Sequence, residues 1–473
     1  MEEVLENQDL IAEQREKEQF EKMTKTPIPK LIISLGIPTM LNMMVTSLYN
    51  MADTLFVSGL GDQATGAVSV VLSLMSIIQA IGFTLGMGAG AIVSTLLGKR
   101  KQKEADTVAA TAFFSALIIG VVITVFGLLF LPDLMRFFGA TEEVGVAVTT
   151  LEYSQIYSTY ILIAAPLMCM SYVMNNLLRA QGKAFISMVG LVTGAVINIA
   201  LDPILIYGAN MGMAGAAIAT MASQAISFGI LLFIFLSGRT ITHFRIGDIS
   251  RKFSVYGNII ATGFPSFCRQ ILASLCTVLL NRTIGDLNID GGLAAFGVVQ
   301  KVFMLAFSIS LGIGQGYQPV LGYNHSAGKF DRVRSAYLFT LIFSMGLMVV
   351  FAIACAIFAP ALMDVFLEAK GAEEVGVRTL QFQCISMPLL PVNFMAGITY
   401  QAVGSKLSAT LLSISRQGMF YIPLIFILPT FFGVVGLEIL QMTSDILAFA
   451  FAVPYTVLFL RSLKKAEAEQ KTE

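Results

Sequence analysis

The segment PDLMRFFGATEEVGVAV (residues 132–148) returns later in the chain as PALMDVFLEAKGAEEVGVRT (residues 360–379). Both contain a proline, a Leu-Met pair, a phenylalanine and the run Glu-Glu-Val-Gly-Val. Three more pairs keep the same order: LGIPTM (35–40) with TGFPSF (262–267), LGMGAG (85–90) with LGIGQG (311–316), and LRAQGKA (178–184) with YQAVGSK (400–406). We therefore predict two copies of one unit, residues 31–237 and 256–460, joined by a basic, polar linker at 238–255.

The composition indicates that both copies lie in a membrane. Of 473 residues, 56% are hydrophobic and 13% are charged, about half the charged fraction of a soluble protein. Such a chain must place most of its apolar side chains against lipid. Twelve apolar segments are long enough to span a bilayer of about 30 Å. They are expected at 31–57, 65–95, 106–131, 150–178, 185–207, 213–237, 256–281, 293–320, 334–358, 380–402, 408–431 and 434–460.

These segments predict an all-α integral membrane protein with two six-helix repeats. Because six is even, both repeats enter the membrane in the same sense, as parallel repeats around a central cleft. Two polar tails, at 1–30 and 461–473, flank them. The first tail lacks the pattern of a secretory signal and is expected to be helical or disordered.

The charges of the loops predict the orientation. Loops after even-numbered segments are basic: Lys99, Arg100, Lys101, Lys103, Arg179, Lys183, Arg239, Arg245, Arg251, Lys252, Lys329, Arg332, Arg334, Lys464 and Lys465. Loops after odd-numbered segments are acidic or neutral: Asp62, Asp133, Glu142, Glu143, Glu373 and Glu374. Basic loops stay in the cytosol, so we expect both termini there.

Several function classes find no support in the sequence. The net charge is zero, so no nucleic-acid partner is expected, and the absence of a GxxxxGK[ST] motif argues against ATP. LGMGAG lies within a span, where close helix packing explains small residues better than nucleotide binding. Gly120 and Gly127 are interpreted in the same way. His243 and His325 are expected to be solvated loop residues rather than ligands.

Catalysis is not expected either. No nucleophile–base pair and no metal-ligand spacing stands out, so the chain is predicted to be neither an enzyme nor dependent on a cofactor. The cysteines form no evident disulfide framework and are interpreted as small packing residues. They are Cys169, Cys268, Cys276, Cys355 and Cys384.

Polar residues interrupt the fifth span at NIALDPILIY (198–207). Asn198 and Asp202 are four residues apart and thus share one helix face. Pro203 has no N–H, so the carbonyl of Ile199 loses its helical donor. A carboxylate within a membrane costs about 2.5–3.5 kcal/mol on insertion scales, and such residues usually mark ion or substrate paths.

Two further oxygen-bearing residues are expected near this stretch, Asp53 of the first span and Thr220 of the sixth. Together with Asn198 and Asp202 they offer hard oxygen ligands for a cation such as Na+, or a protonatable pair. The alternative is that Asp202 is neutral and bonds to Asn198 only to fix the packing of helices.

The second repeat carries different charges at similar depth: Arg269, Lys301, Arg416 and Asp445. One interpretation is a charge-balanced structural network in which Asp445 pairs with an arginine. The other is a cavity wall that senses the charge of a substrate.

Taken together, these motifs resemble the multidrug and toxic compound extrusion (MATE) family, and most closely its prokaryotic branch, from about residue 30 to 460. The resemblance implies a location in the plasma membrane of a bacterial or archaeal cell. The resemblance is carried by NMAD in the first span, LRAQGK, NIALDPILIYG and GMAGAAIAT, in this order. It implies a Na+- or H+-coupled antiporter whose cation site maps to Asp53, Asn198, Asp202, Thr220 and Asn175. The proline associated with bending of the first helix maps to Pro38, and Pro203 is a second candidate hinge.

Three functions follow as hypotheses. The leading one is export of amphipathic, often cationic, drugs or toxic compounds in exchange for Na+ or H+. The second is a flippase or exporter of lipid-linked or anionic amphipathic substrates, held by Arg269, Lys301 and Arg416. The third is a membrane scaffold that transports nothing. The expected partners are the lipid bilayer and small amphipathic substrates, and the resemblance implies that a monomer suffices.

Overall fold

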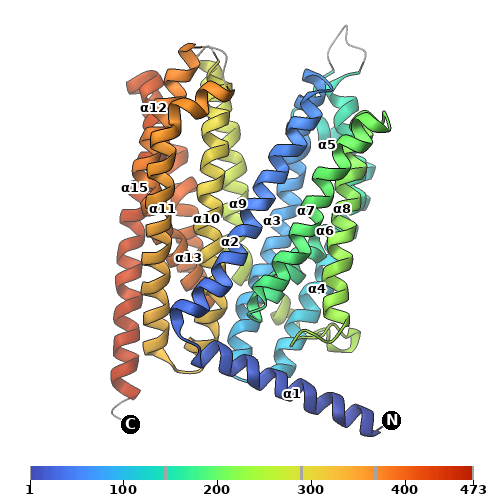
Figure 1. Cartoon of the computed structure of the whole chain (residues 1–473), viewed down its shortest axis with the longest axis vertical. Coiled ribbons are helices and arrows are strands. Elements are labelled where there is room, and N and C mark those ends of the chain that lie inside the picture. Colours follow the sequence, from blue (N-terminus) through green and yellow to red (C-terminus); the bar gives the residue numbers. More distant parts are fainter. Residues whose placement is uncertain (1, 143–147, 288–290, 367–369, 471–473) are drawn as a thin grey trace. The chain divides into compact units, whose positions relative to one another are not determined.

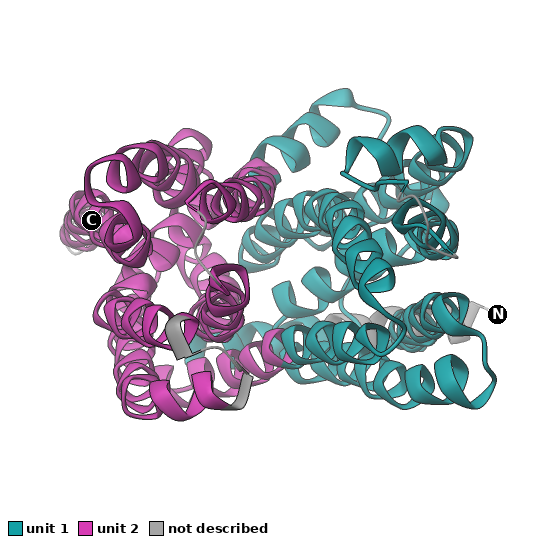
Figure 2. Ribbon diagram, turned by 90° about the horizontal axis from the view of Figure 1, so that it is seen from above, with its two compact units in different colours: residues 1–25, 45–263 teal, residues 26–44, 264–473 magenta. Residues whose placement is uncertain are grey.

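The computed structural model describes residues 2–142, 148–287, 291–366 and 370–470. Throughout these residues the regular secondary structure is helical, which confirms the all-α fold class (Figure 1). Glu143, expected in an acidic loop, lies outside the described residues. The chain divides into two compact units, coloured separately in Figure 2.

Unit 1 comprises residues 1–25 and 45–263. Its elements are α1 (Glu2–Lys25), the second part of α2 (Ile28–Ser58), α3 (Asp62–Gly98), α4 (Gln102–Leu129), α5 (Leu131–Phe137), α6 (Thr150–Ala180), α7 (Ala184–Pro203), the π-helical turn η1 (Ile204–Gly208), α8 (Gly212–Leu236), the 3-10 turn η2 (Ile246–Asp248) and the first part of α9 (Phe253–Asp286).

Unit 2 comprises residues 26–44 and 264–473. Its elements are the first part of α2, the second part of α9, α10 (Gly292–Ser326), α11 (Phe330–Phe366), α12 (Lys370–Ser386), the 3-10 turn η3 (Met387–Leu389), α13 (Leu390–Val403), α14 (Lys406–Ile414), the π-helical turn η4 (Ser415–Tyr421) and α15 (Ile422–Gln470).

The number of spans follows from the last helical stretch. By length and composition, 11 stretches of the described residues can cross a membrane, and the last runs for 65 residues from Lys406 to Gln470. At 1.5 Å per residue it would measure about 98 Å, roughly three times a bilayer core. Gly433 has non-helical dihedral angles (φ 56°, ψ −132°) and divides it. Two spans therefore meet at Gly433, which gives the twelve predicted spans within the described residues.

Each unit is built around one strongly buried span. In α6 of unit 1 and in residues 372–403 of unit 2, 78% of the apolar window is buried, more than in any other described span. A side chain at Gly120 of α4 would overlap Pro166 of α6, and one at Gly127 would overlap Leu162. Both glycines thus allow α4 to approach α6 closely, which confirms their interpretation as packing residues.

The two units do not follow the two sequence repeats. Residues 26–44 of α2 pack in unit 2, whereas 45–58 pack in unit 1. The first part of α9, residues 253–263, packs in unit 1, and 264–286 pack in unit 2. Each unit therefore contains a helical segment from the other repeat, while the repeat boundaries themselves stay a prediction.

Repeated glycine motifs lie where the segments supplied by the other repeat, residues 26–44 and 253–263, pack. In unit 1, a Cβ at Gly263 of α9 would overlap the carbonyl of Thr84 on α3. In unit 2, a Cβ at Gly316 of α10 would overlap Gly36 of α2. LGMGAG thus packs against the segment containing TGFP, and LGIGQG packs against the segment containing LGIP. Helix packing, the expected role of LGMGAG, is confirmed.

The N-terminal tail is helical through Lys25, one of the two expected states. Met23 of α1 is fully buried, and the guanidinium of Arg100 lies 4.5 Å from the ring of Phe20. The C-terminal tail, predicted from residue 461, continues α15 to Gln470. The described part of the N-terminal tail thus forms a helix of its own before α2, whereas that of the C-terminal tail extends the last span.

The linker between the repeats packs on unit 1. The ring of Phe244 stacks on Phe113 and Phe235, with centroids 4.4 and 4.3 Å apart. The backbone N–H of His243 donates to Asp106 Oδ1 at 2.9 Å, while the imidazole is partly exposed. The five cysteines are free, and four of them are buried, as expected for packing residues.

The close approach at Gly316 gives a test of the fold. We expect Gly316→Ala to lower the free energy of unfolding by about 1–3 kcal/mol, because the methyl group has no room against the backbone of α2. Gly297→Ala is the matched control on α10, since a Cβ there meets open space. It should be neutral or slightly stabilising, because alanine favours helix. Thermal unfolding in detergent measures both, and equal melting temperatures would contradict the assigned contact.

Candidate functional site

A connected set of polar side chains lies inside unit 1. The hydroxyl of Tyr157 on α6 donates to Asp53 Oδ2 of α2 at 2.9 Å and lies 3.2 Å from Thr220 Oγ1 of α8. The amide of Asn198 on α7 donates to Thr220 Oγ1 and to Asp202 Oδ1, both at 3.4 Å. Four helices therefore bring Asp53 and Asp202 into one hydrogen-bonded network.

This network is buried and rich in unused acceptors. All five residues are buried, and Asp202 has no exposed surface. Asp53 Oδ1, Asn198 Oδ1 and Asp202 Oδ2 have no hydrogen-bond partner among the described residues. A buried acceptor without a donor costs about 1–3 kcal/mol. Three such oxygens in one network point to a proton or a cation that would satisfy them.

The local structure of α7 explains how its two residues reach the network. Asn198 and Asp202 are one turn apart, and both are buried, so they share the inner face of the helix. Pro203 ends the regular helix, and a π-helical turn follows at once. The N–H of Ile204 bonds to Leu201, and the N–H of Ala209 bonds to Ile204, five residues back. Turns of this kind frequently occur at functional sites.

The two carboxylates influence each other electrostatically. The charges of Asp53 and Asp202 interact, and like charges in a buried site oppose joint ionisation. Protonation or a bound cation would relieve this repulsion. Hard cations take oxygen ligands, and the network offers carboxylate, amide and hydroxyl oxygens. The residues present therefore fit Na+ or H+ equally well.

Of the residues predicted for the cation site, Asn175 alone is placed elsewhere. Its amide donates to the carbonyl of Ser187 at 3.2 Å, and Ser187 Oγ donates back to the carbonyl of Asn175. Asn175 and Tyr157 lie on the same helix, 18 residues and thus about 27 Å apart. The two hydrogen bonds between Asn175 and Ser187 connect α6 to α7. No contact among the described residues supports a role of Asn175 in cation binding.

Tyr157 takes the place on α6 that the sequence analysis assigned to Asn175. The signal available in the sequence was a tyrosine within an apolar span, whose hydroxyl needs a partner when buried. That signal does not say which way the ring points. Thirteen tyrosines occur in the chain, so the signal alone does not single out Tyr157.

The candidate hinge Pro38 lies in the part of α2 that packs in unit 2, whereas Asp53 lies in the part that packs in unit 1. The helix continues through Pro38 without interruption. A hinge role of Pro38 and Pro203 stays a prediction.

Unit 2 holds a buried ion pair between two of the four charged residues predicted there. Arg416 Nε donates to Asp445 Oδ1 at 2.6 Å, and both side chains are almost fully buried. Asp445 also accepts from Gln441 at 2.8 Å and from Ser386 at 3.2 Å. The guanidinium of Arg416 lies over the ring of Phe303, 4.8 Å from its centroid. This ion pair agrees with one of the two interpretations, a network in which Asp445 pairs with an arginine, and the interpretation as a cavity wall stays a prediction.

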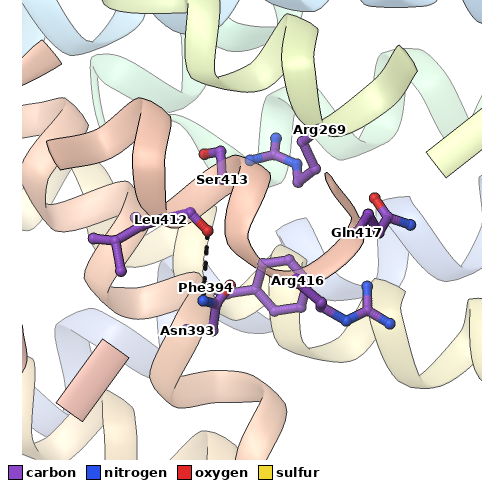
Figure 3. Close-up of a pocket in the computed structure, with 8 residues that line it drawn as sticks. Arg269, Asn393, Phe394, Leu412, Ser413, Arg416 and Gln417 are labelled. Carbon is purple, nitrogen blue, oxygen red and sulfur yellow. Dashed lines mark hydrogen bonds between the residues drawn. The ribbon is translucent and has the colours of Figure 1, made fainter. Parts of the chain in front are cut away.

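A pocket lies beside this ion pair (Figure 3). Its lining consists of Arg269, Asn393, Phe394, Gly397, Leu412, Ser413, Arg416 and Gln417. The guanidinium of Arg269 extends from α9 toward Ser413, while that of Arg416 lies on the side of Gln417. Lys301 is partly buried on α10 and does not line the pocket. Of the four charged residues, Arg269 and Arg416 line the pocket, and Asp445 pairs with Arg416. Lys301 belongs to neither the pocket lining nor the ion pair.

Comparison with known proteins connects both repeats to one family. A family model described as MatE matches residues 38–204 and 265–427. The multidrug export protein MepA of Staphylococcus saprophyticus subsp. saprophyticus is 25% identical over 424 residues, which cover 89% of this chain and 91% of MepA. MepA of Staphylococcus aureus (strain MRSA252) is 25% identical over 421 residues, with the same coverage.

Solved structures give the same result for the fold. A MATE protein in complex with MaL6 has a TM-score of 0.88 and 26% identity, covering 94% of this chain and 99% of that one. The outward-facing conformation of a multidrug resistance MATE family transporter of the MOP superfamily has a TM-score of 0.88 and 26% identity, covering 94% and 98%.

Tyr157 provides a test of the network. We expect Tyr157→Phe to lower the free energy of unfolding by about 1–3 kcal/mol, because Asp53 Oδ2 loses its donor in a buried place. Tyr160→Phe, on the same helix and partly exposed, is the matched control and should change little. Thermal unfolding of both variants measures the difference. The network assignment is wrong if the two variants are equally stable.

Proposed function

Because the chain belongs to the MATE family, we propose that it is a secondary antiporter that exports amphipathic, often cationic, compounds in exchange for Na+ or H+. The observation that carries this proposal is the buried network of Asp53, Tyr157, Thr220, Asn198 and Asp202 with its three unpartnered oxygens. The names of the MepA relatives, which are multidrug export proteins, support the export of drugs.

Binding of the coupling ion would act through the charge of this network. A proton or Na+ on Asp53 and Asp202 removes the repulsion between them and satisfies oxygens that are otherwise unpaired. An ion can shift a conformational equilibrium only by as much as its affinity differs between the conformations. We infer that the outward- and inward-open forms differ in how closely α2 and α7 present these two carboxylates. Pro38 and Pro203 would be the places where the two helices bend.

Location and orientation complete the proposal. The twelve spans make the chain a multi-pass membrane protein. The basic loops favour a plasma membrane with both termini in the cytosol. We expect a monomer to carry out the whole cycle, without ATP.

A second candidate function, export or flipping of an anionic amphiphile, is favoured by one observation. The pocket of unit 2 is lined by two arginines, Arg269 and Arg416, whereas the network of unit 1 contains two carboxylates. An anionic substrate would find its counter-charge in unit 2. A cationic substrate would not.

The coupling ion can be determined with proteoliposomes. With a Na+ gradient and a pH gradient imposed separately, we expect one of the two to drive efflux of a fluorescent cationic dye. Asp202→Asn and Asp53→Asn should each reduce gradient-driven efflux by about tenfold or more, because each removes an ionisable ligand from the network.

Asp133→Asn is the matched control. Asp133 lies on α5 with 78% of its side chain exposed, and its loss should leave efflux unchanged. Normal gradient-driven efflux by Asp202→Asn would refute the proposed coupling site. Absence of any gradient-driven flux in the unmodified chain would favour a scaffold instead of a transporter.

A further inference from the structure

The pocket of unit 2 combines positive charge with an apolar wall. Its eight lining residues include two arginines and three neutral polar side chains, Asn393, Ser413 and Gln417, beside Phe394 and Leu412. The space that they enclose is small and partly open, with room for about one water molecule. We propose that this pocket binds the oxyanion headgroup, a carboxylate or a phosphate, of an amphiphilic molecule.

The ion pair beside the pocket leaves one hydrogen-bond donor of Arg416 available. Both oxygens of Asp445 are engaged: Oδ1 accepts from Arg416 and Gln441, and Oδ2 accepts from Ser386. Arg416, by contrast, is only 4% exposed, and its Nη2 has no hydrogen-bond partner among the described residues. A buried donor left unsatisfied is costly. The carboxylate is thus fully used, whereas the guanidinium retains a donor for a further acceptor.

Neighbouring contacts hold Arg416 in place. Its guanidinium lies 4.8 Å from the centroid of Phe303 and 5.9 Å from that of Phe394. Its backbone carbonyl accepts from Ser444 Oγ at 2.6 Å. A planar guanidinium fixed in this way is well suited to a planar oxyanion, because its N–H groups form a rigid fork.

The second arginine reaches the pocket from another helix. Arg269 is partly buried on α9, and its guanidinium extends toward Ser413 of α14 (Figure 3). On the far side, Asn393 donates to Ser415 Oγ at 3.0 Å, which fixes the amide against the backbone turn. Arg269, with Ser413 near its guanidinium, and Arg416 on the side of Gln417 thus supply charged and polar lining from two parts of the chain. The ring of Phe394 supplies apolar surface beside the guanidinium of Arg416.

The backbone around Arg416 has a counterpart in unit 1. Arg416 lies within the π-helical turn η4, Ser415–Tyr421, just as Asp202 is followed by the π-helical turn η1. Such turns are rare and frequently occur at functional sites. Both units thus interrupt a helix next to a buried charged side chain, and the charge is negative in unit 1 and positive in unit 2.

Binding can be measured without transport, by thermal unfolding of the purified chain in maltoside micelles. The four buried cysteines become reactive on unfolding and report it through a thiol-reactive dye. Three probes share one tail and differ in the head: dodecanoate, dodecyl phosphate and dodecyltrimethylammonium. Ligands that bind the folded state raise the unfolding temperature. We expect dodecanoate or dodecyl phosphate to raise it in a saturable way, and dodecyltrimethylammonium not to.

Variants locate the effect. Arg269→Gln should weaken the binding of the anionic probe about tenfold or more, because a hydrogen bond to a charged group is lost. Arg269→Lys should retain part of the affinity, because it keeps the charge but not the fork. Arg282→Gln, an exposed position on the same helix, is the matched control and should bind as the unmodified chain does. The double variant Arg416→Gln/Asp445→Asn removes the ion pair without leaving a buried charge unpaired, and should also weaken binding.

A bilayer comparison separates the two sources of such a headgroup. Nanodiscs of phosphatidylcholine, with and without phosphatidylglycerol, test a lipid phosphate. Stabilisation by phosphatidylglycerol that depends on Arg269 identifies a membrane lipid as the ligand. Stabilisation by dodecanoate alone identifies a carboxylate amphiphile.

Two results would overturn the site. One is an equal shift by the anionic probes in the unmodified chain and in Arg269→Gln. The other is equal stabilisation by the cationic and anionic probes. Binding of an oxyanion in this pocket does not depend on the proposed transport function. The transport function is needed only to say what the bound molecule does in the cell. Asp202→Asn should bind the anionic probe normally, so that failed coupling and a failed pocket give different results.

Discussion

The low polarity of a bilayer forces every charge within a span to be neutralised, paired or put to use. In unit 1 the charged groups are two carboxylates, Asp53 and Asp202. Hydrogen bonds through Tyr157, Thr220 and Asn198 join them. Their hydrogen bonds leave three acceptor oxygens open. The network is therefore incomplete by itself, and the proposed coupling ion would satisfy these acceptors.

In unit 2 the group with unused hydrogen-bonding capacity is a cation instead of a carboxylate. Asp445 is saturated by three donors, whereas Arg416 keeps an unpaired Nη2. An ion pair of this kind contributes little net stability, because desolvation offsets the attraction between the charges. Its effect is to hold a guanidinium at a fixed place beside a pocket. The duplicated architecture thus carries two chemically opposite centres, one in each unit.

Much of this architecture could be predicted from periodicity and spacing. The i, i+4 relation placed Asn198 and Asp202 on one face, and the lengths of apolar segments gave twelve spans. Asp53 and Thr220 were also expected near this stretch, and the family resemblance agreed. The hydrogen bonds between them needed the structure, because distance along the chain says nothing about which helices meet. Tyr157 was missed because its hydroxyl direction depends on how α6 rotates against α2. Asn175 was assigned to the wrong neighbourhood, since one helix can carry two polar residues about 27 Å apart. The glycine motifs predicted close packing but not their partners.

The division of α2 and α9 between the units has a consequence for how such a chain can arise. Each unit is completed by a segment that the other repeat supplies: residues 26–44 in unit 2 and 253–263 in unit 1. A single six-helix copy would lack the segment that its own second helix packs against. Two copies could complete each other only by exchanging their first helices, as in a domain-swapped dimer. Gene duplication and fusion would then have made an obligatory exchange permanent, which ties the folding of each half to the presence of the other.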